Sequence, residues 1–280
     1  MIIERKIIEF TQNQTKILKT GFGSSSIDDT VLEKIVYISD GLKVKGFAAY
    51  PKIITDKSPC IIWCRGGYGN AGILDNFYAK GILGQIASWG YLVLESQYRG
   101  NDRGEGKDEF GGKDLNDILN LIPLAKEFEF ANTDIWGIEG WSRGGLMTYL
   151  TLTKNHDFKA AVSVAGISEV ECSMTESNFM KKLISSHQEI IDENFCRSRT
   201  ILNNLDNFSR ETPILLLHGL KDERVPVHHS VDLSKELLKL NIEHRLILLE
   251  NGDHFLKSHK PEVDEFRKNW FKKYLKNGAK

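Results

Sequence analysis

Short apolar runs that suit β-strands alternate with longer segments of helical spacing along most of the chain. The predicted strands are Val31–Ile38, Lys43–Tyr50, Cys60–Cys64, Tyr91–Gln97, Asp134–Glu139, Lys159–Ala165, Pro213–Leu217 and His244–Leu249. The predicted helices cover residues 75–89, 114–126, 142–153, 227–240 and 261–276. Apolar strands separated by helices are typical of a parallel sheet with helices on both faces. The pattern therefore predicts an α/β fold with about eight strands.

The same pattern predicts how the chain is divided. Asp40-Gly41 separates the first two strands and favours a hairpin, so these strands are expected to add an antiparallel edge to the sheet. Residues 1–30 are weakly patterned and are expected to form an N-terminal extension, packed on a main domain of residues 31–280. The stretch of residues 167–210 is too long for a plain connection and carries helical patches. It is expected to form a small cap over the functional site.

Two residues affect the predicted helix of residues 114–126. Asp114 stands at its start, where a side-chain oxygen can cap free backbone N–H groups. Pro123 lacks a backbone donor and clashes with the preceding turn. We therefore expect Asp114 to be the N-cap and Pro123 to kink or divide the helix.

Charge narrows the possible partners. The 280 residues include 37 Lys and Arg and 38 Asp and Glu, a formal net charge of -1, so bulk electrostatics favour neither nucleic acid nor an anionic membrane. Near the C-terminus, basic residues alternate with apolar residues at helical spacing and are expected to form the solvent-facing side of a docked helix. These basic residues are Arg267, Lys268, Lys272, Lys273, Lys276 and Lys280.

The cysteines and the N-terminus indicate a compartment. Four cysteines, Cys60, Cys64, Cys172 and Cys196, are too few for a disulfide framework in a chain of this length. Cys60 and Cys64 lie on an apolar strand and are expected to be buried thiols. Residues 1–10 carry charges within their apolar run, unlike a signal peptide, and no membrane span of about 18 apolar residues is expected. The expected location is the cytoplasm.

A Gly-x-Ser-x-Gly sequence, Gly140-Trp141-Ser142-Arg143-Gly144, lies between a predicted strand and a predicted helix. A sharp strand-to-helix turn lifts a serine hydroxyl out of the sheet, and the flanking glycines let neighbouring backbone approach closely. The N-terminus of the helix favours negative charge that develops there. These features predict that Ser142 is a nucleophile.

A nucleophilic serine needs a base and a group that orients the base. Asp222 and His254 each follow one of the last two predicted strands, in the Ser, Asp, His chain order of α/β-hydrolases. We expect His254 to be the general base and Asp222 to hold its imidazole in the productive tautomer. His259 and Glu223 are the alternatives. Three other histidines are expected outside the site: His218 as a support of the acid-bearing loop, and His228 and His229 in solvent.

An oxyanion hole needs two donors aimed at the developing negative charge. One is expected to be the backbone N–H of Arg143, directly after the nucleophile. The other is expected from Gly66 or Gly67, in the glycine-rich loop after the strand that ends at residue 64. Tyr68 and Trp141 adjoin these donors and are expected to contact the substrate.

Arg65 leaves two interpretations open. At the rim of the site, its guanidinium would bind a carboxylate on the substrate, and the neighbouring Arg143 would reinforce that preference. Alternatively, Arg65 forms a salt bridge with Asp102 or Asp75 and stiffens the loop.

These motifs together resemble the catalytic domain of the prolyl oligopeptidase (S9) family of serine peptidases, from about residue 42 to the C-terminus. The residues that carry the resemblance are Tyr98-Arg99-Gly100, Gly140-Trp141-Ser142-Arg143-Gly144-Gly145, Phe158-Lys159-Ala160-Ala161-Val162, His218-Gly219, Asp222, Val225-Pro226 and Gly252-Asp253-His254. The resemblance implies an α/β-hydrolase fold and peptidase activity.

The expected function is a serine hydrolase that forms an acyl-enzyme. Its substrates are expected to be short peptides or amides, or carboxylic esters. A carboxylesterase without peptidase activity is one alternative, and a ligand-binding α/β-hydrolase scaffold without catalysis is another. No metal and no organic cofactor is implied, and the sequence leaves the oligomeric state open.

Overall fold

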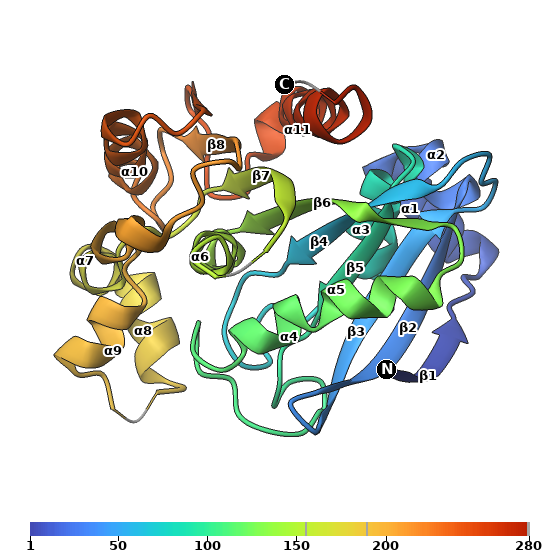
Figure 1. Ribbon diagram of the computed structural model, residues 1–280, viewed down its shortest axis with the longest axis horizontal. Helices are drawn as coiled ribbons and strands as arrows, with labels where there is room; N and C mark the ends of the chain where they lie inside the picture. The colour runs from blue at the N-terminus through green and yellow to red at the C-terminus, as the bar shows by residue number, and fades with distance from the viewer. Residues whose placement is uncertain (155, 189, 279–280) are drawn as a thin grey trace.

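A nine-stranded sheet forms the centre of the computed structural model, which describes residues 1–278 except 155 and 189 (Figure 1). Its spatial order is β1-β2-β3-β5-β4-β6-β7-β8-β9. The strands are β1 (Ile2–Ile7), β2 (Thr30–Ser39), β3 (Leu42–Pro51), β4 (Ser58–Cys64), β5 (Leu92–Ser96), β6 (Ala131–Trp141), β7 (Phe158–Val164), β8 (Ile214–Gly219) and β9 (His244–Leu249). Strands β4 to β9 run parallel, whereas β1, β2 and β3 form an antiparallel edge. The predicted mostly parallel sheet is confirmed.

The ninth strand, β1, lies within the N-terminal extension, where the sequence pattern predicts no strand. It pairs antiparallel with β2, and Arg5 lies opposite Ile35. Four of its six side chains are exposed. An edge strand bonds to one neighbour only, so it needs no apolar alternation, and its charges discourage pairing with other chains. The prediction of about eight strands was therefore short by one.

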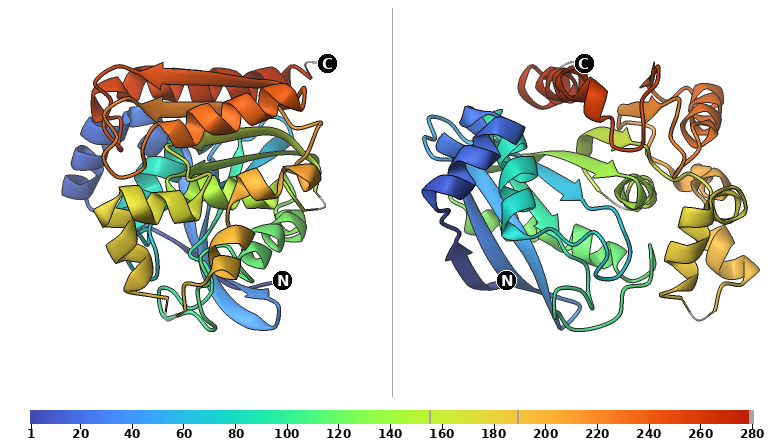
Figure 2. Two further views of the ribbon diagram at one scale, coloured as in Figure 1. Left: turned by 90° about the vertical axis from the view of Figure 1, so that its left-hand side faces the viewer. Right: turned by 180° about the vertical axis from the view of Figure 1, so that it is seen from behind.

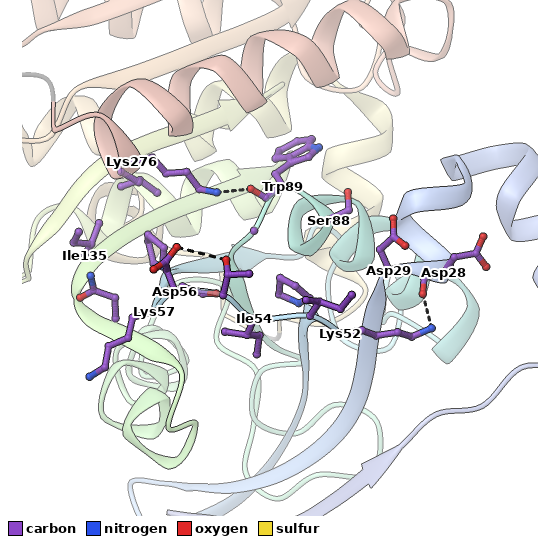
Figure 3. Close-up of a pocket in the computed structure, with 18 residues that line it drawn as sticks. Asp28, Asp29, Lys52, Ile54, Asp56, Lys57, Ser88, Trp89, Ile135 and Lys276 are labelled. Carbon is purple, nitrogen blue, oxygen red and sulfur yellow. Dashed lines mark hydrogen bonds between the residues drawn. The ribbon is translucent and has the colours of Figure 1, made fainter.

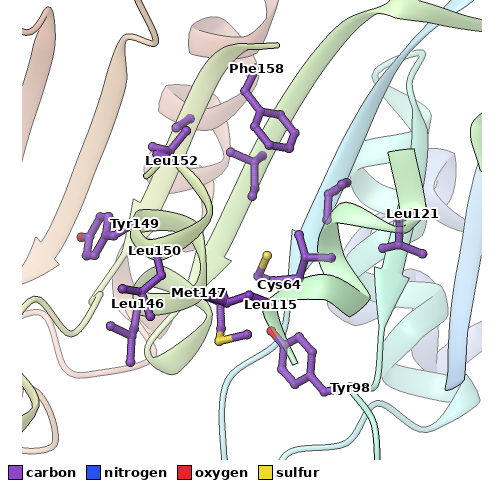
Figure 4. Close-up of a cluster of buried hydrophobic side chains, with 14 of the residues drawn as sticks. Cys64, Tyr98, Leu115, Leu121, Leu146, Met147, Tyr149, Leu150, Leu152 and Phe158 are labelled. Atoms are coloured by element: carbon purple, nitrogen blue, oxygen red, sulfur yellow. The ribbon is translucent and has the colours of Figure 1, made fainter. Parts of the chain in front are cut away.

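Helices cover both faces of the sheet, as predicted. One face is covered by α3 (Asn76–Ser88) and α11 (Lys260–Phe271), and the short helices α1 (Gln12–Phe22) and α2 (Ser24–Asp28) pack against α3. The other face is covered by α4 (Leu115–Leu119), α5 (Leu121–Leu124), α6 (Arg143–Thr151) and α10 (His228–Lys239). Figure 4 shows part of the hydrophobic core on this second face, where α4, α5 and α6 bury Leu115, Leu121, Leu146 and Met147 against the sheet. Among the described residues, no helix is long and apolar enough to cross a bilayer.

The predicted helix of residues 114–126 is divided into α4 and α5, and the break lies a few residues before Pro123. Helix α4 ends at Leu119, four residues before Pro123, because Pro123 offers no N–H to the carbonyl of Leu119 and crowds it. A 3₁₀ turn, Ala125–Glu127, follows α5. Asp114 stands at the predicted N-cap position of α4, but its side chain does not cap the helix. Its carboxylate makes no capping bond and instead accepts hydrogen bonds from the Gly111 N–H and from Arg143.

One basic residue near the C-terminus does not face solvent as predicted. Arg267 is 2% exposed, although it was expected on the solvent-facing side of the helix. Its guanidinium pairs with the buried Glu139 at 2.6 Å and with Asp264 at 2.8 Å. A buried carboxylate needs a partner, and Arg267 supplies it across the contact between α11 and β6. The chain continues beyond α11 as a π-helical turn, Lys272–Lys276.

Three helices occupy the stretch for which a cap is expected. They are α7 (Val170–Glu176), α8 (Asn178–Ser185) and α9 (Glu193–Ser198), followed by the 3₁₀ turns Ile201–Asn203 and Leu205–Asn207. They lie on the side toward which the arrowheads of the parallel strands point, and they project from the body of the protein (Figures 1 and 2).

Glu95, in the middle of the sheet, is a buried acid, and within the part of the chain that the structure describes neither of its carboxyl oxygens has a hydrogen-bond partner. Burial raises its pKa to about 8. In the unfolded chain a glutamate has a pKa of about 4.3. Between this pH and the pKa in the folded state, the folded protein binds more protons than the unfolded chain, so the free energy of unfolding falls as pH rises. Glu95→Gln is expected to raise the free energy of unfolding by about 1–3 kcal/mol at about pH 8 and hardly at all near about pH 4.

Thermal unfolding at the two pH values measures this difference. Glu4→Gln, at an exposed position on β1, is the matched control and should change neither value. An equal effect of Glu95→Gln at both pH values would show that the buried charge is not its cause.

Candidate active site

The predicted site residues come from loops at the carboxyl ends of four parallel strands. The glycine-rich loop follows β4, Ser142 follows β6, Asp222 follows β8 and His254 follows β9. Strands β4 and β6 are neighbours, with Cys64 opposite Gly140. Since carboxyl ends of parallel strands meet at one edge of a sheet, the topology brings these loops together.

Ser142 occupies a strained turn between β6 and α6. Its φ of 58° and ψ of -121° lie in a region that non-glycine residues rarely adopt. Two glycines make the turn possible. A Cβ on Gly140 would lie 1.9 Å from the carbonyl oxygen of Gly144, and a Cβ on Gly144 would lie 2.0 Å from that of Cys64. The geometry is that of a nucleophile elbow.

His254 and Asp222 are in direct contact. The imidazole Nδ1 lies 2.7 Å from Asp222 Oδ2, and both residues are buried. Their loops touch because Gly219 has no side chain: a Cβ there would lie 2.2 Å from the carbonyl oxygen of Gly252. The Lys221 N–H also donates to Gly252, at 2.9 Å. The position of the acid relative to the histidine is therefore fixed by backbone packing.

The carboxylate of Asp222 is held by several donors. Its Oδ1 accepts hydrogen bonds from the backbone N–H groups of Arg224 and Val225, each at 2.9 Å. Burial acts to raise the pKa of Asp222, but the hydrogen bonds with His218 and His254 outweigh it and hold the pKa well below its usual range. The group stays ionised at neutral pH and is able to stabilise an imidazolium.

Among the other histidines, His218 also contacts the acid, with its Nε2 3.4 Å from Asp222 Oδ2. His218 is buried between Ser230 and the Val225 carbonyl, where it supports the acid-bearing loop. His259 bonds to Glu262 and to the carbonyl of Glu250, so both its ring nitrogens are engaged elsewhere. The expectation for His229 was wrong, because it is fully buried and contacts Ser168 and Ser173.

The loop after β4 turns two successive carbonyls inward. The Arg65 carbonyl accepts a hydrogen bond from Tyr98 Oη, and the Gly66 carbonyl accepts one from the Arg65 guanidinium. Each trans peptide plane points its N–H opposite to its carbonyl, so the N–H groups of Gly66 and Gly67 face away from the interior. Both glycines line the cavity that contains Ser142.

The expected contact between Arg65 and substrate is wrong, because the side chain is fully buried. Its guanidinium donates to the carbonyls of Gln97, Gly66 and Gly69 at 2.8–3.1 Å. The suggested partners Asp102 and Asp75 are wrong, but Arg65 does form a salt bridge with another acid, Asp108, at 3.9 Å. Asp102 pairs with Lys34, and Asp75 caps α3. Arg65 thus stiffens the loop through carbonyl oxygens, which a sequence pattern does not display.

Tyr68 and the Arg143 side chain also point away from the cavity. Tyr68 is 1% exposed, and its hydroxyl donates to Gln188 in the cap stretch, so the expected substrate contact is wrong. The Arg143 guanidinium pairs with Asp108 at 2.5 Å and Asp114 at 2.7 Å and donates to the Gly67 carbonyl. Its side chain therefore ties the elbow to the glycine-rich loop and does not reinforce anion binding.

Ser142 and His254 line one cavity of about 570 Å³. This volume suits a small ligand. Aromatic and aliphatic side chains from the two halves of the chain form much of its wall: Trp63, Tyr78, Ile82, Trp141, Phe179 and Leu183. Trp141 thus lies where a substrate contact was expected, and α8 of the cap stretch supplies Phe179 and Leu183.

Arg224 is a cavity residue that the sequence analysis did not single out. Its guanidinium carbon lies 4.4 Å from the ring centroid of Phe179 and 4.7 Å from that of Phe255. The only sequence signal is its place two residues after Asp222, in the loop that the acid holds. It brings a cation to the wall, which Lys257, Lys260 and Arg267 also line.

A larger cavity, of about 820 Å³, lies away from this chemistry (Figure 3). Its described lining includes Trp89, Ile135 and Lys276, and none of the three predicted catalytic residues. The Lys276 ammonium is engaged by the Trp89 carbonyl at 2.7 Å. The smaller cavity is therefore the candidate active site.

Arg65→Met is expected to lower the free energy of unfolding by about 2–4 kcal/mol, since one buried and two part-buried carbonyls lose a charged donor. The glycine-rich loop should loosen, and kcat/KM should fall equally for neutral and anionic substrates. Thermal unfolding and paired kinetics measure the two effects, with the exposed Arg103→Met as control. A loss confined to anionic substrates would restore the recognition role.

Comparison with known proteins identifies the family. The sequence profile of the prolyl oligopeptidase family matches residues 81–278. The chain is 32% identical over 215 residues to the uncharacterized peptidase YtmA of Bacillus subtilis (strain 168), which covers 75% of this chain and 80% of YtmA. It is 26% identical over 220 residues to dipeptidyl peptidase 8 of Homo sapiens, covering 71% of this chain and 24% of that protein.

Solved structures agree on the fold. The acylaminoacyl peptidase of Pyrococcus horikoshii superposes with a TM-score of 0.77 at 24% identity, covering 96% of this chain and 45% of that one. A puromycin-hydrolyzing peptidase of Mycobacterium tuberculosis gives a TM-score of 0.70 at 20% identity and covers 87% and 39%. This chain spans less than half the length of either structure, and the likeness confirms the α/β-hydrolase fold. The family profile and the match to YtmA show that the chain belongs to the prolyl oligopeptidase family of serine peptidases.

Proposed function

We propose that this peptidase hydrolyses short peptides, at an amide bond whose acyl side carries an apolar or aromatic side chain. The observation that carries the proposal is the shared cavity, in which Ser142 and His254 face walls formed largely by aromatic and aliphatic groups. Burial of apolar surface would favour such a side chain over a charged one. The names of the relatives, acylaminoacyl and dipeptidyl peptidases, support an amide substrate.

In the proposed mechanism, Ser142, His254 and Asp222 act as one unit. Ser142 Oγ attacks the carbonyl carbon while His254 takes its proton and then gives that proton to the leaving amine. Water hydrolyses the acyl-enzyme in a second cycle. Asp222, bonded to His254 Nδ1 at 2.7 Å, leaves the other ring nitrogen for proton transfer and stabilises the imidazolium.

The proposed oxyanion hole consists of backbone donors. The N–H of Arg143 belongs to the first turn of α6, where N–H groups lack a partner within the helix. The N–H groups of Gly66 and Gly67 face away from the interior beside Ser142. A Cβ on Gly66 would come within 3.4 Å of Ser142 Cβ, so this loop lies close enough to share the developing charge.

Matched amide and ester substrates test the proposal. A series of aminoacyl p-nitroanilides and the corresponding p-nitrophenyl esters would be compared by kcat/KM, with apolar, acidic and basic acyl groups. We expect amide hydrolysis, with the highest kcat/KM for apolar acyl groups. Ester hydrolysis without any amide hydrolysis would identify a carboxylesterase instead, and a preference for charged acyl groups would contradict the assignment of the cavity.

We also propose that the protein acts in the cytoplasm. The structure contains free thiols at Cys60, Cys64, Cys172 and Cys196, and such thiols persist most readily in a reducing compartment. Burial raises the pKa of Cys60 to about 12, so this thiol is unreactive. Fractionation of the source cells, followed by an activity assay of each fraction, would locate the protein.

A further inference from the structure

Three side chains with different donor atoms meet at the base of the cap stretch, outside the candidate active site. Cys172 and Glu176 lie one turn apart on α7, and His228 is the first residue of α10. Cys172 Sγ lies 3.2 Å from Glu176 Oε1 and 3.4 Å from His228 Nε2. His228 Nε2 also lies 3.3 Å from Glu176 Oε2, the other oxygen of the same carboxylate.

These three separations are similar to the distances between ligand atoms on one face of a tetrahedral zinc site. Zinc binds Cys sulfur at about 2.3 Å and His nitrogen and carboxylate oxygen at about 2.0–2.2 Å, so the ligand atoms of a tetrahedral site lie about 3.3–3.6 Å apart. The three observed separations differ from these edges by a few tenths of an ångström or less. A small rotation of the Glu176 carboxylate would present a single oxygen to the ion.

The donor set also selects the kind of ion. One sulfur, one imidazole nitrogen and one carboxylate oxygen suit zinc and its d-block neighbours, whereas Mg²⁺ and Ca²⁺ prefer oxygen ligands alone. All three residues are at least partly exposed. An ion can therefore reach them from solvent, and water can complete the coordination.

We propose that Cys172, Glu176 and His228 bind a zinc ion that clamps helix α7 of the cap stretch onto α10. Cys172 binds as the thiolate and releases its proton to solvent. The ion would join two segments that are 56 positions apart in the chain.

The place of the clamp gives it a consequence for the candidate active site. Helix α7 leads directly into α8, whose Phe179 and Leu183 line the cavity. Helix α10 follows the loop that carries Asp222. Zinc would therefore restrain the cap side of the cavity wall relative to the acid-bearing loop. The binding itself does not depend on the proposed peptidase function.

Direct metal binding tests the proposal on the whole chain. Purified protein would be stripped of metal with a chelator and titrated with Zn²⁺ against a chromophoric competitor, and separately with Co²⁺, whose thiolate complexes absorb by charge transfer. We expect one zinc per chain and a thiolate–cobalt band. Loss of a group that only hydrogen-bonds to a metal ligand typically weakens metal binding by about 10- to 100-fold. Cys172→Ser and His228→Gln each remove a ligand itself and should weaken binding by about 100-fold or more.

Two control variants separate this cluster from other donors. Cys196→Ser removes the other cysteine of the cap stretch, and His259→Ala removes a histidine that also contacts a carboxylate. Both should keep the affinity and the cobalt band. Hydrogen exchange of α7 should slow on zinc addition in these controls and not in Cys172→Ser.

Several results would overturn the proposal. They are zinc binding that Cys172→Ser leaves unchanged, a wild-type protein that binds no zinc, or equal binding of Mg²⁺. Loss of peptidase activity with intact zinc binding, by contrast, would contradict only the proposed function. The two conclusions are thus tested separately.

Discussion

Ser142→Ala is expected to abolish labelling by a fluorophosphonate probe and to lower kcat by about 10³-fold or more. The hydroxyl is the group that would attack the substrate, and the residual rate would come from binding and the backbone oxyanion donors alone. Alanine is close in size to serine and meets the same strained φ of 58°, so the midpoint of thermal unfolding should change little.

Intact-mass spectrometry after labelling, together with kcat for the best anilide substrate, measures the effect. Ser186→Ala, at an exposed position in the cap stretch, is the control and should label like wild type. Labelling of the Ser142→Ala variant at another serine would overturn the assignment of the nucleophile.

His254→Ala is expected to match the loss seen for Ser142→Ala, because removing either member of a cooperating pair costs about as much as removing both. Asp222→Asn should cost somewhat less, since a neutral amide still accepts from the Arg224 and Val225 N–H groups but no longer stabilises an imidazolium. Each variant would be assayed for kcat and for probe labelling rate.

The structure supplies a matched control for the base. His259 lies five residues later and bonds to Glu262 and the Glu250 carbonyl, away from Asp222. His259→Ala should therefore keep nearly full activity. If His259→Ala silenced the enzyme and His254→Ala did not, the general base would have to be reassigned.

The strands and the order of the site loops follow from the sequence alone. Runs such as Cys60–Cys64 and Pro213–Leu217 are apolar because both faces of a central strand are covered. A run of this kind can be recognised from a few consecutive residues. The elbow is equally local, because the glycines at 140 and 144 and the serine between them act on one turn. Once the strands are parallel, the loops after them meet at one edge, and Asp222 lies against His254.

The edge strand and the buried polar groups did not follow from the sequence. Strand β1 hydrogen-bonds to one neighbour only, and four of its six side chains are exposed. Its sequence therefore does not show the alternation of apolar and polar residues that predicts a strand. Arg65, Tyr68 and His229 are of residue types that are common at surfaces, yet each is buried with partners from other segments. Arg65 bonds to the Gln97 carbonyl, 32 positions away, and no local pattern marks a carbonyl as an acceptor.

The sequence by itself determined the α/β architecture, the elbow at Ser142 and the chain order of the predicted catalytic residues, because short-range propensity and periodicity act within a few residues. Tertiary structure alone decided which cations are buried, which apolar side chains wall the cavity and which donors meet at Cys172. The partner of a polar side chain is set by packing between distant segments, where burial makes an unpaired group costly. His228 and Cys172 illustrate this, since nothing within either segment indicates that the other lies 3.4 Å away.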